Sequence, residues 1–281
     1  MGTNKWYTLL NDNMFKLVFR RKIDILEKIL RLVPELSNIN LLYLPIDPHN
    51  KIDFYAKDTE RDLKVITNRK DTIITEMHNG VEDGFSNRMF IYNYQDIASQ
   101  TGREGSYTKY KKSILVLFLN GILYKDSDNF YERIITFRDI FKKRVDGLSV
   151  IHIFELPKVD KNSKGLIVPW LLFFKSKTRE ECMEAAINNE DMQNVFDLMD
   201  YYNENTIFKQ IMRYKEKEHL DQMNRETLAR EAGEADGVLK GIEQNRRDTL
   251  YNMVKLKMPM EQMELITGLS KEKINQYIAE F

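Results

Sequence analysis

The feature that most limits the fold of this chain is an alternation of apolar and polar residues between positions 62 and 78. The odd positions are mostly apolar and the even positions include two carboxylates: Leu63, Val65, Ile73, Thr75 and Met77 against Asp62, Lys64, Glu76 and His78. Successive side chains of a strand point to opposite faces of a sheet. The pattern therefore predicts two strands joined by a turn at residues 68–70, with the odd face packed on the core.

The register of this hairpin decides whether its polar residues form a site. A turn centred on Arg69 places Asp62 directly opposite Glu76, and directly opposed residues have Cβ atoms about 4.5–5.5 Å apart. Lys64 and His78 then flank the two carboxylates on the same face. A slip of one residue would send the carboxylates to opposite faces, so the register is a test of the prediction.

Two facing carboxylates repel each other unless a cation neutralises them. Mg²⁺ and Mn²⁺ favour oxygen ligands, and such a metal activates water and stabilises charge on a phosphoryl group. We expect Asp62 and Glu76 to hold the metal, and Lys64 and His78 to position water or phosphate. Two alternatives stay open: the carboxylates are ordinary polar residues of a solvent-facing strand, or Asp53 replaces Asp62 as the first ligand.

The other segments predict an α/β core followed by helices. Helical spacing begins after Asp12, which we expect to be the N-cap of the first helix. Another helix is expected at about 86–100. The apolar runs 112–119 and 149–156 are typical of buried strands, whereas the chain from residue 166 onward predicts helices alone.

Composition narrows the compartment and the partners. The 43 basic and 43 acidic residues cancel, so nucleic-acid binding requires a local patch rather than an overall positive charge. Cys182 is the single cysteine; it is expected to pack in a helix and suits a reducing, cytoplasmic environment. We see no signal peptide and no run of the ~20 apolar residues that a membrane helix needs, so no membrane association is expected.

An ordered set of short motifs accompanies the hairpin. They read NDNMFKLVF at 11–19, DLKVITNRKDTIITEMH at 62–78, Arg88 with Tyr92, FELPK at 154–158, WLLF at 170–173 and ITGL at 266–269. Together they resemble the motifs of the bacterial recombination-promoting nuclease (Rpn) family, transposase-like members of the PD-(D/E)XK nuclease superfamily. The resemblance covers most of the chain, and its specificity lies in the order of motifs that are individually weak.

The resemblance implies a restriction-endonuclease-like domain at residues 1–200, with a mixed central sheet flanked by helices, and an all-helical C-terminal region at 201–281. It also implies a Mg²⁺- or Mn²⁺-dependent endonuclease that cuts DNA in recombination or mobile-element biology. By motif position, Asp62 and Glu76 are metal ligands, Arg88 and Tyr92 lie at the substrate phosphate, and Asp12 is an additional site acid.

One residue departs from the family pattern. His78 stands where Rpn proteins have Gln and the wider superfamily has Lys. Imidazole can still donate to a phosphate or accept from water. The departure leaves open the alternative of a catalytically inactive nuclease fold that binds DNA or a protein partner.

The C-terminal region supports two interpretations. Residues 206–232 are highly charged, which is typical of a solvated helix or a coiled-coil arm, and Gly233, Gly237 and Gly241 indicate either a flexible joint or a close helix contact. Three short helices are expected at 242–281, broken at Pro259 and Gly268. They either form a helix-turn-helix-like reader of DNA or hold a homodimer together through the C-terminal helices.

Overall fold

The computed structural model describes residues 5–43, 63–100, 110–125, 130–138, 141–143 and 147–280. Asp62 and Asp53, the two candidates for the first metal ligand, lie outside these ranges. The chain forms two compact units, one up to Ile211 and one from Met212. Each unit is described by itself below.

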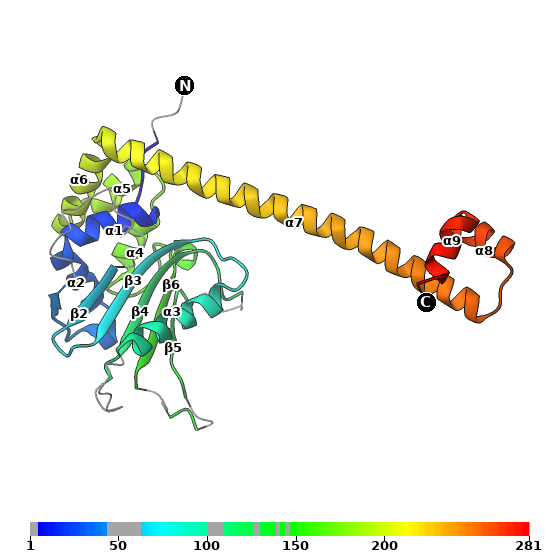
Figure 1. Ribbon diagram of the computed structural model, residues 1–281. Helices are drawn as coiled ribbons and strands as arrows, with labels where there is room; N and C mark the ends of the chain where they lie inside the picture. The colour runs from blue at the N-terminus through cyan, green and yellow to red at the C-terminus, as the bar shows by residue number, and fades with distance from the viewer. Residues whose placement is uncertain are drawn as a thin grey trace. The chain divides into compact units, whose positions relative to one another are not determined.

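The first unit is built on a mixed sheet (Figure 1). Within the described residues six strands follow the spatial order β1-β2-β3-β4-β6-β5. Their bounds are β1 Leu41–Tyr43, β2 Leu63–Thr67, β3 Thr72–Asn79, β4 Ser113–Asn120, β5 Glu132–Ile135 and β6 Ser149–Glu155. The central strands β3, β4 and β6 run parallel, and the outer pairings are antiparallel. The expected buried strand at 112–119 is thus confirmed as the centre of the sheet.

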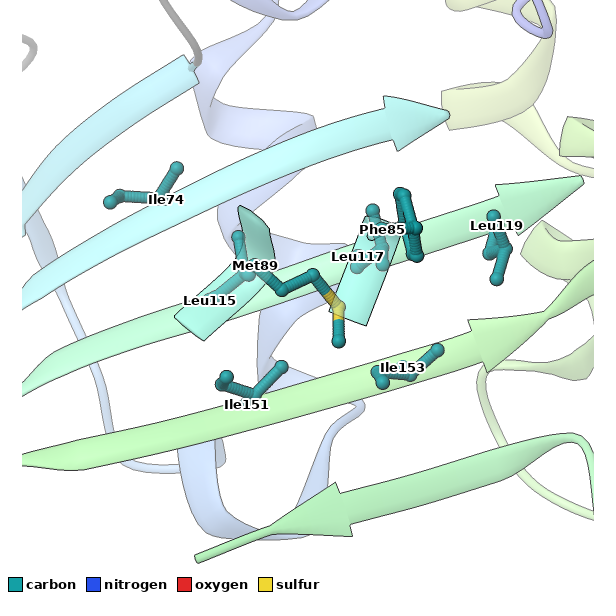
Figure 2. Close-up of a cluster of buried hydrophobic side chains, with 8 residues drawn as sticks. All are labelled: Ile74, Phe85, Met89, Leu115, Leu117, Leu119, Ile151 and Ile153. Carbon is teal, nitrogen blue, oxygen red and sulfur yellow. The ribbon is translucent and has the colours of Figure 1, made fainter. Parts of the chain in front are cut away.

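One face of the sheet is covered by α3 (Phe85–Ser99). Phe85 and Met89 of this helix pack on aliphatic side chains of the three parallel strands: Ile74, Leu115, Leu117, Leu119, Ile151 and Ile153 (Figure 2). Isoleucine and leucine at alternate positions give each strand an apolar surface on this side, and their burial drives the helix onto the sheet.

The opposite face is covered by N-terminal helices and by α4. The elements here are α1 (Asp12–Arg21), α2 (Ile23–Arg31), a 3₁₀ turn at Pro34–Leu36, and α4 (Val168–Phe174) after a second 3₁₀ turn at Leu156–Lys158. Phe118 of β4 contacts Phe15 of α1 and Phe174 of α4, with ring centroids 5.9 and 4.8 Å apart. The odd-numbered apolar residues of the hairpin are buried on this side, as the alternation predicted.

The first helix begins one residue earlier than expected. Asn11 is the N-cap of α1, because its side-chain oxygen accepts the backbone N–H of Met14 at 3.1 Å. Asp12 is the first helical residue, so the prediction that it caps the helix was wrong. Asp12 therefore keeps both carboxylate oxygens for side-chain partners. The helical region also breaks at Lys22, which separates α1 from α2.

Helices alone follow, as predicted for the chain after residue 166. They are α5 (Arg179–Ala186), α6 (Glu190–Glu204), α7 (Thr206–Lys255), α8 (Met260–Thr267) and α9 (Lys271–Ile278). Helix α7 runs without interruption through Gly233, Gly237 and Gly241, so the glycines form no joint. Each glycine costs only about 1 kcal/mol relative to alanine, and the surrounding Ala, Glu and Lys residues favour helix. The expected break near residue 242 was wrong for the same reason.

In the second unit α8 and α9 pack on the last turns of α7. The buried side chains are Leu250, Met253, Met263, Ile274 and Tyr277. Gly268 adopts a left-handed conformation, with φ of 65°, after α8, and Ser270 caps α9 by accepting the backbone N–H of Lys273. These two local signals fix the short turn between the helices.

Candidate functional site

The observed register of the β2–β3 hairpin is the predicted one. Leu63 pairs with Thr75, Lys64 with Ile74 and Val65 with Ile73. Lys64 and Glu76 therefore share the face of the sheet that α3 covers. Asp62 precedes the first described residue of β2, so its pairing with Glu76 stays a prediction.

Glu76 and His78 lie near the carboxyl end of β3. Their side chains are 19% and 16% exposed, and Oε1 of Glu76 is 3.7 Å from Nδ1 of His78. The carboxyl ends of parallel strands are where open α/β sheets bind their ligands. β4 pairs in parallel with β3 up to Asn120, so this edge of the sheet is continuous beyond the two residues.

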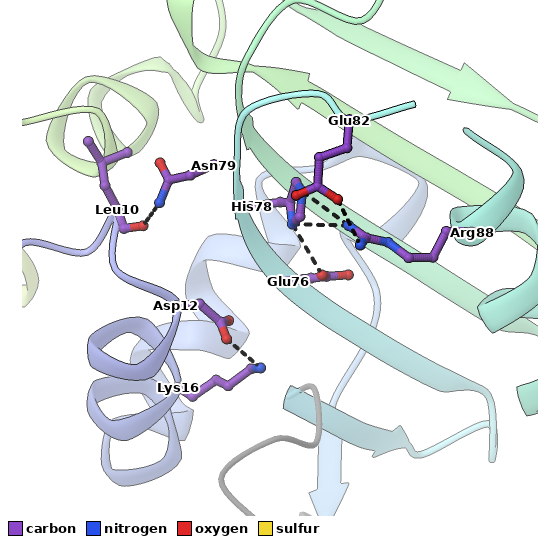
Figure 3. Close-up of polar contacts among 8 residues, drawn as sticks. All are labelled: Leu10, Asp12, Lys16, Glu76, His78, Asn79, Glu82 and Arg88. Atoms are coloured by element: carbon purple, nitrogen blue, oxygen red, sulfur yellow. Dashed lines mark hydrogen bonds and ion pairs between the residues drawn. The ribbon is translucent and has the colours of Figure 1, made fainter. Parts of the chain in front are cut away.

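His78 is held from two sides by α3. Its ring stacks on Phe85 with centroids 4.7 Å apart, and its Nε2 is 3.1 Å from Nη2 of Arg88. The guanidinium of Arg88 also lies over the ring of Phe85 and reaches Glu82, whose Oε2 is 3.4 Å from Nη1 (Figure 3). Glu76, His78 and Arg88 are thus brought together, as the sequence predicted.

Burial lowers the pKa of His78 below its ordinary value, and the positive charge of Arg88 lowers it further. The carboxylates of Glu82 and Asp12 act in the opposite direction but are weaker. The imidazole is therefore neutral at pH 7. Because arginine only donates hydrogen bonds, the Nε2 facing Arg88 is the acceptor and the proton lies on Nδ1, the atom nearer Glu76.

Asp12 and Lys16 approach the same end of β3 from α1 (Figure 3). The ammonium of Lys16 donates to Oδ2 of Asp12 at 2.6 Å, and Lys16 is 5% exposed. Oδ1 of Asp12 is buried and has no hydrogen-bond partner. A further hydrogen bond, from the side-chain amide of Asn79 to the carbonyl of Leu10, joins the entry of α1 to the end of β3.

The remaining predicted residues lie at the margin of this cluster. Lys64 forms an ion pair with the buried carboxylate of Asp96 on α3. Tyr92, one turn after Arg88 on α3, is 45% exposed. Glu155 and Lys158 are structural, as expected: Glu155 is fully buried, its Oε1 accepts the backbone N–H groups of Leu123 and Tyr124, and its Oε2 is 2.8 Å from the ammonium of Lys158.

Four residues of the cluster were not predicted from the sequence: Lys16, Glu82, Phe85 and Asp96. Lys16 had a usable signal, because it stands four residues after Asp12 and so shares its face of α1. Glu82, Phe85 and Asp96 had none. Their roles depend on how α3 crosses the sheet, which no local spacing specifies.

A divalent cation fits the oxygen donors of this site. Mg²⁺ is usually held by one or two carboxylates, with water completing its shell. Glu76 supplies a half-buried carboxylate, and the buried, unbonded Oδ1 of Asp12 is a second oxygen donor beside it. Among the described residues no group of three Asp, Glu, His or Cys side chains is arranged to hold a metal, so a fully protein-ligated metal centre does not fit.

Comparison with known proteins gave one match. The family model described as PD-(D/E)XK nuclease family transposase matches residues 9–228, which is most of the chain. No curated protein and no solved structure matches. Within the part of the chain that the structure describes, no helix is long and apolar enough to cross a membrane.

Proposed function

Because the chain belongs to the PD-(D/E)XK nuclease family transposases, we propose that it is an endonuclease that hydrolyses DNA with a divalent metal ion, Mg²⁺ or Mn²⁺. The observation that carries the proposal is the cluster of Glu76, His78 and Arg88 at the carboxyl end of β3. A buried carboxylate, a neutral imidazole and a guanidinium within one hydrogen-bonded chain are the groups that phosphodiester hydrolysis requires.

In this proposal Glu76 holds the metal ion together with Asp62, the residue that the hairpin register places opposite it, and Asp12 is the additional acid. The bound metal would lower the pKa of a water molecule and stabilise charge on the phosphoryl oxygens. Hydrolysis joins the water oxygen to phosphorus and releases one bridging oxygen as an alcohol. The protein contributes the fixed positions of its carboxylates on a rigid strand.

His78 has a positioning role in the proposed site. With its Nε2 accepting from Arg88, it presents Nδ1–H toward Glu76 and so fixes the carboxylate in the orientation that a metal needs. A neutral imidazole adds no positive charge beside the metal. This role explains how a histidine can stand where the superfamily has lysine without removing metal binding.

Arg88 and Tyr92 are proposed to contact the DNA backbone. The guanidinium of Arg88 has five N–H donors, and its contacts to His78 and Glu82 leave donors for a phosphate oxygen. Tyr92 exposes its side chain one turn further along α3. Lys64 is tied to Asp96, so its contribution to phosphate binding would require that ion pair to open.

The experiment that tests the function is plasmid cleavage by wild type and Glu76→Gln, each with Mg²⁺, Mn²⁺ or chelator. We expect metal-dependent nicking by wild type and its loss in the variant, because glutamine keeps the shape but not the charge of the ligand. Glu190→Gln, an exposed carboxylate at the start of α6, is the matched control. Nicking that persists in Glu76→Gln contradicts the site, and no nicking with any metal contradicts the function.

A thermal shift experiment separates the enzyme from the alternative of an inactive binding module. An intact carboxylate site raises the melting temperature when Mg²⁺ or Mn²⁺ is added, because a ligand that binds only the folded state stabilises it. A degenerate site gives no shift. Binding of labelled DNA without cleavage or metal response would support the inactive module, acting in recombination or mobile-element biology as a DNA-binding factor in the cytoplasm.

The second unit is proposed to mediate a homodimer. Leu256, Leu265 and Ile266 are 76%, 85% and 59% exposed on a unit with a small core, and exposed apolar clusters mark association surfaces. The mass of wild type and Leu265→Glu by light scattering tests this proposal. A monomeric wild type would refute it and leave DNA binding by α8 and α9 as the other role.

A further inference from the structure

Lys16 is the most deeply buried lysine near the proposed site, and nothing in the proposed reaction yet uses it. It is 5% exposed, and lysine is almost never buried unless its ammonium is paired. Its described partner is Asp12, one helical turn earlier, at 2.6 Å. The chain therefore retains a positive charge in a place where an apolar side chain would pack at lower cost.

The location of Lys16 connects it to the reaction centre. Helix α1 packs beside β3, and the bond from Asn79 to the carbonyl of Leu10 fixes the start of the helix to the end of that strand. The charge of Asp12 is close enough to raise the pKa of His78. Figure 3 shows Asp12 and Lys16 on one side of β3 and Arg88 on the other.

The charges around Glu76 give the ammonium a purpose. Arg88 supplies one cation from α3, His78 is neutral, and Lys64 is bound by Asp96. Three carboxylates surround this end of β3 in the described residues: Glu76, Glu82 and Asp12. A phosphodiester adds a further negative charge, so a single guanidinium leaves the site short of positive charge when DNA binds.

The Asp12–Lys16 pair is also incompletely satisfied. Oδ1 of Asp12 is buried without a hydrogen bond, whereas buried polar atoms in native proteins almost always have a partner. An ion pair with only a structural role would use both oxygens. An orphaned oxygen beside a buried ammonium indicates a site completed by a ligand.

We propose that Lys16 is a catalytic residue whose ammonium binds a non-bridging oxygen of the scissile phosphate, while Asp12 orients it from α1. The inference rests on the proposed nuclease function and adds a group that the family motifs at β3 do not include. A fixed ammonium aimed at the oxygen where charge develops stabilises the transition state more than the ground state. Its loss should therefore lower kcat more than it raises KM.

The test compares Lys16→Met, Lys16→Arg and wild type in metal-dependent cleavage of a labelled duplex. Removing one preorganised donor lowers kcat by about 10²–10³-fold, and we expect this loss in Lys16→Met with partial recovery in Lys16→Arg. Lys28→Met is the matched control, because Lys28 forms a similar ion pair with Asp191 at 2.7 Å on the exposed surface of α2. This control should cleave like wild type.

The double variant Asp12→Asn/Lys16→Met distinguishes a phosphate ligand from a counter-ion. If Lys16 only neutralises Asp12, removing both charges restores cleavage and overturns the proposal. If Lys16 binds phosphate, the double variant stays as inactive as Lys16→Met. The double variant contains no unpaired buried charge, so it also covers the case in which Lys16→Met alone fails to fold.

A binding measurement gives a readout that does not depend on cleavage. In chelator, the salt dependence of duplex affinity should lose about one unit of slope in Lys16→Met, as expected when one phosphate contact is removed. Cleavage and slope equal to wild type overturn the role of Lys16 while Glu76→Gln remains inactive. If wild type cleaves with no metal at all, the nuclease proposal itself fails and this one falls with it.

Discussion

Replacing Glu155 with alanine should destabilise the first unit without removing a group that takes part in the reaction. Glu155 is fully buried at the end of β6. Its Oε1 accepts two backbone N–H groups, from Leu123 at 2.6 Å and from Tyr124 at 3.0 Å, and its Oε2 faces the ammonium of Lys158 at 2.8 Å. Alanine leaves all three donors without this acceptor.

The size of the effect follows from those contacts. Lys158 is 8% exposed in its side chain, so the variant leaves a buried ammonium whose described remaining acceptor is the carbonyl of Tyr124. Breaking a buried ion pair on one side costs about 3–5 kcal/mol. Glu155→Gln keeps an acceptor for the two N–H groups and should cost about 1–3 kcal/mol, the range for a hydrogen bond to a charged group.

The assay is urea unfolding followed by circular dichroism, with Lys158→Met and the double variant completing a cycle. The double variant should be more stable than Glu155→Ala, because it contains no unpaired buried charge. A loss below about 1 kcal/mol in Glu155→Ala would refute this account of the buried pair. Reduced DNA cleavage by a fully stable Glu155→Gln would show that the residue belongs to the active site.

Three further predictions concern single side chains. The pKa of His78 lies below its ordinary value of 6.5, so the unfolded chain takes up this proton first and stability should fall as pH drops below about 6.5; melting temperatures at pH 5.5 and 7.5 should show a smaller difference in His78→Gln, and an equal difference would count against the shift. Burial raises the pKa of Cys182 to about 12, so iodoacetamide at pH 8 should label it only in denaturant, and rapid native labelling would contradict its burial. Arg88→Lys should weaken cleavage by about tenfold or more, because a single ammonium cannot reach His78, Glu82 and a phosphate together; wild-type rates in this variant would remove Arg88 from the proposed site.

The central hairpin and sheet were predictable because their signals are local. Alternation of apolar and polar side chains fixes which face of a strand is buried, and a single turn sets the register that pairs Lys64 with Ile74. The apolar run of β4 predicted a strand covered on both faces, and the sheet places it between β3 and β6. The proximity of Glu76, His78 and Arg88 followed from the same reasoning together with the family motifs.

The partners of the polar side chains were decided by the tertiary structure. Lys64 bonds Asp96, 32 residues away, and Arg88 meets His78 only because α3 crosses the face of β3. The cap of α1 depended on a choice between adjacent Asn11 and Asp12, which have similar intrinsic preferences. The continuity of α7 through three glycines depended on a sum of small helix propensities that no single residue reveals.

Sequence alone therefore determined the face, the order and the register of the strands, since these depend on neighbours along the chain. Only the tertiary structure decided that Lys16 is buried beside the end of β3 and paired with Asp12 there. Burial of a charge depends on which helix packs over which strand end. That packing is set by the whole apolar core, of which Phe15, Phe118 and Phe174 form the contact between α1, β4 and α4.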